Sequence, residues 1–163
     1  MGPRWIGSRN AWVKRLPPYQ KGHVGEDFFE RICNEADLVV TGGHTAGHDI
    51  HIEGSPIEVK FGTLHDNDPT GDDIVEWLQI RPSSDFTHAA LLCACPDHMH
   101  VWYVDRDPLL AHATGQHTGK AATETLKLSI DPHAPPAWLG TDFASIPLDF
   151  AARVKNTATT STM

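Results

Sequence analysis

Several residue types and patterns that mark particular protein classes are scarce in this chain of 163 residues. Its three cysteines, Cys33, Cys93 and Cys95, are too few, and odd in number, for the disulfide framework of a small secreted domain. No apolar run approaches the roughly 18 residues that a membrane-spanning helix needs. The N-terminus is basic but is not followed by an apolar stretch of the signal-peptide kind. These absences favour an intracellular, cytoplasmic protein without a membrane partner.

The composition is that of an ordinary globular protein. Hydrophobic residues make up 40% of the chain, and a chain of this length buries roughly 70% of the surface that its unfolded form exposes. The core therefore needs neither disulfides nor a structural metal. We expect a basic N-terminal arm over residues 1–20, a single domain over 21–155 and a disordered tail, rich in threonine and serine, over 156–163.

Charge is divided unevenly along the chain. Residues 1–25 carry five bases and no acid, whereas the remainder carries eight bases and all 21 acids. An arm with this charge that also holds Trp5, Trp12 and Tyr19 is suited to lie along phosphates while its rings stack on bases. Alternatively, these aromatic rings pack on the body and complete its core. Four arm residues are thus weak candidates for DNA contacts: Arg4, Arg9, Lys14 and Arg15.

The pattern of apolar residues predicts an α/β fold, a mixed α+β sheet flanked by helices. Helices are expected at 24–33, 72–80, 108–113 and 147–155. Strands are expected at 38–40, 49–53, 57–61, 88–95, 100–104 and 124–130, with a glycine-rich loop at 41–47 and a tight turn at 96–98.

The segment from His48 to Lys60 predicts a β-hairpin. If Gly54 and Ser55 form a two-residue turn, Asp49 and Glu58 become diagonal neighbours, about 7–8 Å apart at the backbone. Side chains alternate between the two faces of a strand. Ile50, Ile52, Ile57 and Val59 then share an apolar face, and Asp49, His51, Glu58 and Lys60 share the opposite one.

Two carboxylates at this separation suit a hard cation. Oxygen ligands with room for water favour Mg²⁺ or Mn²⁺ over Zn²⁺. An amine next to such an ion, here Lys60, can orient an attacking water or take its proton. The alternative interpretation is a solvent-exposed hairpin face on which Lys60 forms an ordinary ion pair.

The segment resembles the signature of the PD-(D/E)XK nucleases, the restriction-endonuclease-like superfamily. Asp49 is followed, after eight residues, by Glu58-Val59-Lys60, although His48 replaces the proline that usually precedes the aspartate. Upstream, Lys21-Gly-His-Val-Gly-Glu26 is similar to the glycine and glutamate pattern that opens the first helix of many members, junction resolvases included. Trp77-Leu-Gln79, on the helix expected at 72–80, and the hairpin expected between Asp85 and Asp105 extend the resemblance to about 85 residues.

The resemblance implies a restriction-endonuclease-like core and a Mg²⁺-dependent DNA endonuclease of restriction, phage or recombination and repair type, with Mn²⁺ as a substitute. In such an enzyme Asp49, Glu58 and the carbonyl of Val59 hold the ion, and Lys60 positions water. Glu26 supports a second ion or its water, and Gln79 is an accessory near the lysine. Each role has an alternative, because acids are common in a first helical turn and a surface glutamine needs no function.

Eleven histidines call for a comparison with zinc sites. His44, His48 and His51 have a suggestive spacing, but the glycines among them exclude the helix of a zinc protease motif. Cys93, Cys95, His98 and His100 would form a zinc site only if all four converged. Otherwise the two cysteines are small buried residues of a sheet.

Other functional interpretations remain open. His51 and Lys120, in the glycine-containing loop 114–120, are further weak candidates for DNA contacts. A structure-specific junction nuclease, a non-catalytic nucleic-acid-binding protein on the same fold and a zinc-stabilised interaction domain are alternatives to the endonuclease. A homodimer would give a route to cutting both strands. The acidic body repels DNA at long range, so we expect binding to need divalent ions and to depend strongly on salt.

Overall fold

The structure, a computed structural model, describes residues 2–42, 49–65, 73–116, 125–144 and 147–160. Its helical elements are η1 (Pro3–Trp5), α1 (Ala11–Lys14), α2 (Pro18–Glu35), α3 (Arg106–His112), η2 (Ala137–Leu139) and α4 (Pro147–Thr160). Its strands are β1 (Val40–Gly42), β2 (Ile50–Ile52), β3 (Ser55–Thr63), β4 (Val75–Ile80), β5 (His88–Ala94), β6 (Met99–Asp105), β7 (Thr114–Gln116) and β8 (Thr125–Ile130). Among the residues described, no helix is both long and apolar enough to cross a membrane.

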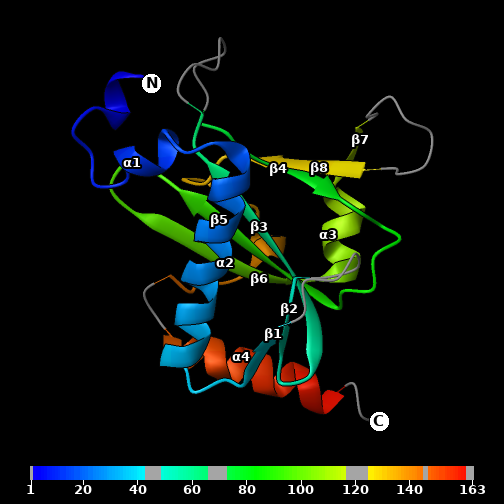
Figure 1. Ribbon diagram of the computed structural model, residues 1–163. Helices are drawn as coiled ribbons and strands as arrows, with labels where there is room; N and C mark the ends of the chain where they lie inside the picture. The colour runs from blue at the N-terminus through cyan, green and yellow to red at the C-terminus, as the bar shows by residue number, and fades with distance from the viewer. Residues whose placement is uncertain (1, 43–48, 66–72, 117–124, 145–146, 161–163) are drawn as a thin grey trace.

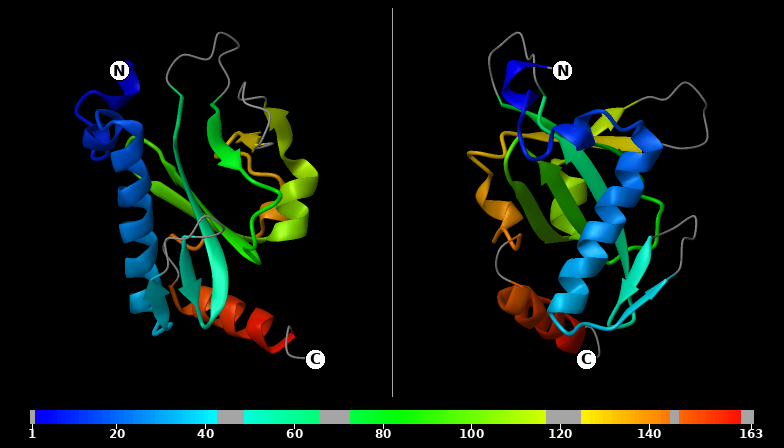
Figure 2. Two further views of the ribbon diagram at one scale, coloured as in Figure 1. Left: turned by 45° about the vertical axis from the view of Figure 1, so that its right-hand side comes forward. Right: turned by 60° about the vertical axis from the view of Figure 1, so that its left-hand side comes forward.

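The strands form two sheets (Figures 1 and 2). The larger has the order β1-β2-β3-β5-β6 and is mixed, because β3 and β5 run parallel while the other neighbours are antiparallel. The smaller, β4-β8-β7, is antiparallel. The predicted mixed sheet with flanking helices is therefore confirmed.

Hydrophobic cores lie on both faces of the larger sheet. On β5, Leu91 and Cys93 point into the core shared with β4, β8 and α3, whereas Ala90 and Leu92 point into the core shared with α2 and α4. In the second core, Phe29 of α2 meets Phe150 of α4 edge-on, with ring centroids 5.6 Å apart. The continuous apolar run of β5 follows from its position, since a central strand is buried on both faces.

Helix α2 confirms the helix predicted at 24–33 and is longer at both ends. Pro18 occupies its first turn, where a missing N–H costs no hydrogen bond. Its buried residues, Gly25, Phe29, Ile32 and Cys33, recur at helical spacing. A Cβ on Gly25 would lie 2.6 Å from the Cβ of Phe61 in β3, so the absence of a side chain lets the helix approach the strand.

The predicted helix at 72–80 is wrong, because residues 75–80 form strand β4. Val75 and Trp77 are buried while Glu76 between them is half-buried, which is the two-residue period of a strand. The strand pairs with β8 and has a bulge between Trp77 and Ile80 that restores Ile80 to the core. The bulge gives the apolar residues an irregular spacing that imitates a helical one.

Other predicted elements agree apart from their ends. The strands and tight turn predicted over 88–104, the short helix after them and the strand ending at Ile130 are present. The strand predicted at 38–40 begins at Val40 and includes Thr41 and Gly42 of the predicted loop, whose remainder lies outside the described residues. Helix α4 continues past 155 to Thr160.

Candidate functional site

The hairpin of β2 and β3 has a different turn from the one predicted. Ile50 pairs with Ile57 and Ile52 with Ser55, so the turn residues are Glu53 and Gly54 and the predicted Gly54-Ser55 turn is wrong. Both turn residues have positive φ, +50° and +81°. This is the combination that a type I′ turn requires, and glycine meets it without strain.

The pairing is displaced by two residues, and a displacement by an even number leaves each side chain on its face. The apolar residues of the predicted inner face are buried, as expected. The polar face therefore keeps Asp49, His51, Glu58 and Lys60. His51 lies opposite Pro56 rather than Glu58, and the ladder ends at Ile50, the residue after Asp49.

Glu58 and Lys60 form an ion pair at this face. The Lys60 Nζ lies 2.5 Å from the Glu58 Oε1, and both side chains are largely buried. On β3 they alternate with Ile57 and Val59, whose side chains enter the core shared with α2. β3 and β5 are paired at this level, Glu58 with Ala89. Backbone pairing on a central strand thus fixes the positions of both charged groups.

Asp49 lies just before β2 and is tied to β3. Its Oδ2 accepts a hydrogen bond from the backbone N–H of Val59 at 2.7 Å, and its own N–H donates to the carbonyl of Ile57 at 3.0 Å. The aspartate is thereby held beside the strand that carries Glu58. The charge of Asp49 also acts on Glu58, so the two acids lie in the same part of the hairpin, while their predicted role as a pair of metal ligands stays a prediction.

The surroundings of Glu58 raise the pKa of its carboxyl group. Burial is the largest cause, the attraction of Lys60 opposes it, and the negative charge of Asp49 adds to it. Arg81 also lowers this pKa through its charge. Two close acids, one of them nine-tenths buried, form a set of hard oxygen donors with excess negative charge, and such a set fits a divalent cation.

Arg81 is a site residue that the sequence analysis did not identify. It follows β4 directly, and β4 passes β3 at Gly62, where an added Cβ would lie 2.9 Å from the carbonyl oxygen of Glu76. Arg81 lies near Glu58 because β4 packs against β3 at this point, and no local sequence signal predicts that packing.

Gln79 lies on β4 and not on a helix, so that part of its predicted placement is wrong. Its φ of +57° is unusual for a residue other than glycine, and it falls within the bulge between Trp77 and Ile80. Its side chain is exposed. Bulges are common next to active sites, where they redirect a side chain, and this one lies two residues from Arg81.

Glu26 lies on α2, which packs against the opposite face of the larger sheet. Its carboxylate lies 3.8 Å from the Nδ1 of His23, one turn earlier, and its side chain is 20% exposed. Gly25, the residue before Glu26, contacts Phe61, which follows Lys60 on β3. Glu26 therefore lies at about the level of Phe61 along the strand. The helix therefore carries Glu26 close to the strand that holds the pair.

Comparisons with known proteins give a likeness in structure alone. No protein-family profile matches the sequence, and no curated protein matches it. The fold is similar to that of a bacterial homing endonuclease. That structure, of I-Ssp6803I, has a TM-score of 0.51 and 16% sequence identity, with 86% of this chain and 98% of that one covered. The likeness supports the predicted fold class, a mixed α+β core of a kind found in a nuclease, while membership of the PD-(D/E)XK superfamily stays a prediction.

Parts of the basic arm are engaged with the body. Trp5 is fully buried, as the core-completing alternative expects, whereas Trp12 and Tyr19 are exposed. Arg4 pairs with Asp73 at 2.5 Å, and Lys14 donates to the carbonyl of Leu64 at 2.6 Å. Arg9 and Arg15 are exposed.

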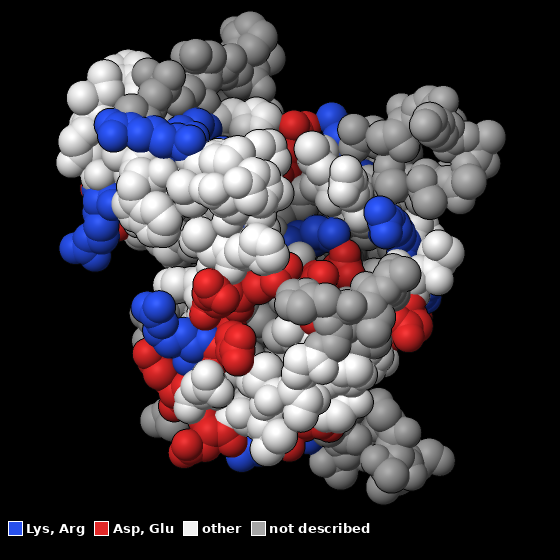
Figure 3. All heavy atoms as spheres, in the orientation of Figure 1, with Lys and Arg blue, Asp and Glu red and all other residues white. Residues whose placement is uncertain are grey.

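Acidic and basic side chains are unevenly spread over the surface. On the face in Figure 3, acidic side chains form a band across the middle, and basic side chains lie at the upper left, toward the N-terminal segment, and also beside this band. His44, His48 and Lys120 lie outside the described residues. Whether they contribute to a site therefore stays a prediction.

A second group of candidate ligands does converge. The ligand atoms of Cys95, His98 and His100 all lie within 4.8 Å of one another. Cys93 stands apart from this group, although its Sγ lies 4.0 Å from that of Cys95. Its hydrogen bond with Cys93, aided by one with His100, lowers the pKa of the Cys95 thiol. A hydrogen bond with Asp142 raises the pKa of His100 to about 9.

Proposed function

We propose that this protein is a DNA endonuclease that hydrolyses phosphodiester bonds with Mg²⁺, for which Mn²⁺ would substitute. The observation that carries the proposal is the convergence of Asp49, Glu58 and Lys60 on one face of the β2–β3 hairpin. The similarity in fold to a bacterial homing endonuclease supports it. The type of substrate, whether duplex or branched, is left to experiment.

In this proposal the two carboxylates and the carbonyl of Val59 hold the ion. When bound, Mg²⁺ supplies Lewis-acid stabilisation of the charge that develops on phosphate oxygens. Asp49 is already oriented by the N–H of Val59, so it needs little rearrangement to act as a ligand. Binding of a cation also offsets the repulsion between Asp49 and Glu58, which contributes to the raised pKa of Glu58.

Lys60 has a separate role. It pairs with Glu58 across 2.5 Å, and a bound cation would share in neutralising that carboxylate. The ammonium group of Lys60 would orient the attacking water and stabilise the transition state electrostatically. Arg81, exposed and within electrostatic reach of Glu58, is placed to contact a phosphate. Glu26 and Gln79 act as accessory groups, the former toward a second ion or its water.

The test is cleavage of supercoiled plasmid with Mg²⁺, with Mn²⁺ and with EDTA. We expect metal-dependent nicking or linearisation by the wild type and a loss of at least about 100-fold in rate for Asp49→Asn and for Lys60→Met. Asp49→Asn keeps an oxygen to accept the Val59 hydrogen bond, so the hairpin is preserved while the charge is lost.

Asp107→Asn and Lys155→Met are the matched controls, because both residues are exposed and belong to α3 and α4 rather than to the hairpin, and they should cut like the wild type. Cleavage that survives both site substitutions would contradict the proposed site. If no form cuts plasmid, four-way junction DNA is the next substrate. Absence of cleavage there as well would favour the non-catalytic alternative. Linear rather than nicked product would support the expected homodimer.

A further inference from the structure

The turn between β5 and β6 brings together three side chains with nitrogen and sulfur donors. Cys95 follows β5, His98 lies in the turn and His100 is on β6, and the Cys95 N–H donates to the His98 carbonyl at 2.9 Å. The two histidine Nε2 atoms are 3.0 Å apart. Zn–N bonds of about 2.0–2.1 Å set tetrahedral ligands about 3.3 Å apart. The turn thus already holds the imidazoles near the spacing that a shared zinc ion requires.

Asp142 orients the central histidine of this group. Its Oδ2 lies 2.7 Å from the Nδ1 of His100, and its Oδ1 accepts hydrogen bonds from the N–H groups of Val101 at 2.9 Å and Ala144 at 3.1 Å. A proton on Nδ1 shared with a carboxylate leaves the Nε2 lone pair directed toward the other ligands. This carboxylate–histidine arrangement is the one that supports metal-bound histidines in proteins.

The N-terminal segment holds the turn from the other side. The buried Asn10 donates through its side-chain Nδ2 to the carbonyls of Cys95, at 2.8 Å, and His98, at 3.1 Å. Its backbone N–H donates to Pro96 at 2.8 Å. Three segments distant in sequence therefore fix the position of the turn, and its ligand atoms are preorganised.

The burial of Cys95 favours metal binding over catalysis by its thiol. Cys95 is fully buried, so its sulfur has no path to a macromolecular substrate. His98 and His100 line a cavity of about 450 Å³, which is wide enough for an ion and for water. The Nε2 of the neighbouring His133 is paired with Asp73 at 3.2 Å, so water is left to fill a fourth position.

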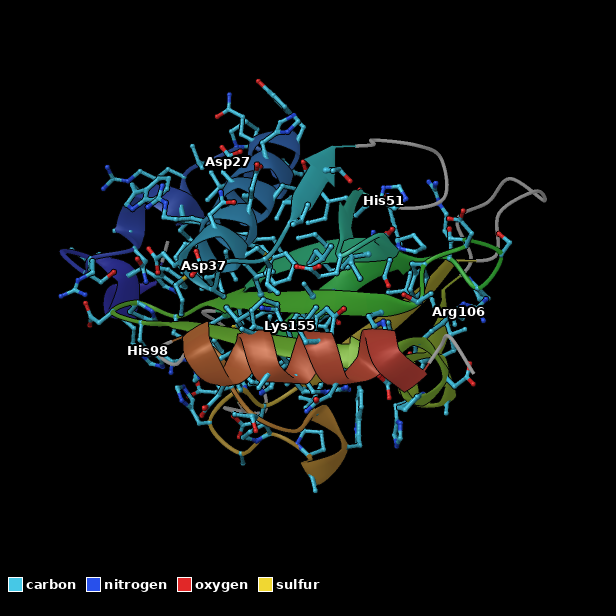
Figure 4. All side chains as sticks on the ribbon, turned by 90° about the horizontal axis from the view of Figure 1, so that it is seen from below. Asp27, Asp37, His51, His98, Arg106 and Lys155 are labelled. Carbon is cyan, nitrogen blue, oxygen red and sulfur yellow. The ribbon has the colours of Figure 1, made fainter. Side chains whose placement is uncertain are left out.

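We propose that Cys95, His98 and His100 bind a structural Zn²⁺ ion that stabilises the β5–β6 turn. A thiolate with two imidazoles favours zinc over Mg²⁺. The site is separate from the proposed nuclease centre, because Cys95 lies six residues along β5 from Ala89, the partner of Glu58, or about 20 Å. Figure 4 shows His98 and His51 at opposite ends of the molecule.

The test uses the untagged full chain. We expect close to one zinc per chain by elemental analysis, and Co²⁺ added to metal-free protein should give a thiolate-to-cobalt charge-transfer band in the near ultraviolet. Cys95→Ser should abolish the band. His98→Gln, whose exposed side chain is not needed for packing, should weaken zinc binding by at least tenfold with the fold retained by circular dichroism. Asp142→Asn should weaken it by about 10–100-fold.

His23→Gln, an exposed histidine of α2, is the control and should leave zinc affinity unchanged. Removal of the ion with a chelator should lower the melting temperature of the wild type but not that of His98→Gln. Zinc content far below one per chain with no cobalt band would overturn the proposal. So would zinc binding that is the same in the wild type, in Cys95→Ser and in His98→Gln. None of these measurements depends on nuclease activity.

Discussion

Glu58 is a glutamate whose behaviour is set by three neighbouring charges and by burial. It is 9% exposed, paired with Lys60 and close enough to Asp49 and Arg81 for their charges to act on it. Burial of a carboxylate costs free energy unless a partner offsets the loss of water. Here the offset is incomplete, since the pKa of Glu58 is raised from its ordinary value of 4.5.

A raised folded-state pKa predicts how stability depends on pH. Protonation of Glu58 favours the folded chain, so its contribution is fully present below pH 4.5 and is lost as pH rises through the folded-state value. Glu58→Gln is neutral throughout. Without divalent ions, we expect it to unfold at higher urea than the wild type at pH 7, with the difference vanishing near pH 4.

Urea denaturation in EDTA across this pH range measures the effect. Glu35→Gln, an exposed glutamate of α2, is the control and should show no comparable gain at pH 7. A Glu58→Gln protein that is less stable than the wild type at pH 7 would mean that the ion pair with Lys60 outweighs the cost of burial. That result would contradict the assignment of burial as the dominant cause.

At the scale of elements, two glycines let α2 and β4 pack closely against β3. A Cβ on Gly25 would lie 2.6 Å from the Cβ of Phe61, and one on Gly62 would lie 2.6 Å from the Cγ2 of Val75. Contacts that short force a shift of backbone or core side chains. Both approaches occur next to the Glu58–Lys60 pair, so the same two glycines set the distance of the flanking elements from the site.

Two glycines of the same helix give a matched prediction. Gly25→Ala should destabilise the protein by about 1–3 kcal/mol because of overpacking against Phe61. Gly22→Ala, where an added Cβ meets nothing within 4 Å, should stabilise it by up to about 1 kcal/mol through helix propensity. Urea denaturation of both variants measures the difference. Equal effects of the two substitutions would show that α2 does not depend on this contact.

At the scale of the whole molecule, the proposed function requires a chain whose own net charge is -8 to bind a polyanion. The N-terminal segment carries the excess of basic residues, yet Trp5 is part of the core and Arg4 and Lys14 already have partners on the body. Removal of residues 1–20 would therefore disturb the fold as well as the charge. Exposed single residues, Arg9 and Arg15 with Trp12 and Tyr19, are the better probes of DNA contact.

For the double variant Arg9→Gln/Arg15→Gln, we expect weaker DNA binding and a shallower salt dependence. Each lost phosphate contact reduces the slope of log K against log salt by about 0.9, so two reduce it by about 1.8. Fluorescence anisotropy over a salt series, with Ca²⁺ in place of Mg²⁺, measures the slope. Arg31→Gln/Lys155→Gln removes the same charge from α2 and α4 (Figure 4). If both double variants change the slope equally, net charge and not the arm governs binding.

The sequence by itself determined which residues share a face. Alternation along β2 and β3 and the helical spacing of α2 are local properties, and a two-residue error in the turn left Asp49, Glu58 and Lys60 together because it moved no side chain across the sheet. The spacing of the motif alone therefore predicts which residues form the candidate site.

The tertiary structure alone decided what depends on distant partners. β4 is a strand because β8 offers an edge to pair with, and its bulge gives the apolar residues a spacing that local periodicity interprets as a helix. The burial of Glu58, the proximity of Arg81 and the meeting of His100 with Asp142, 42 residues later, follow from that packing. Which distant segments come into contact depends on the surfaces that the rest of the fold leaves uncovered, and no local sequence pattern determines this.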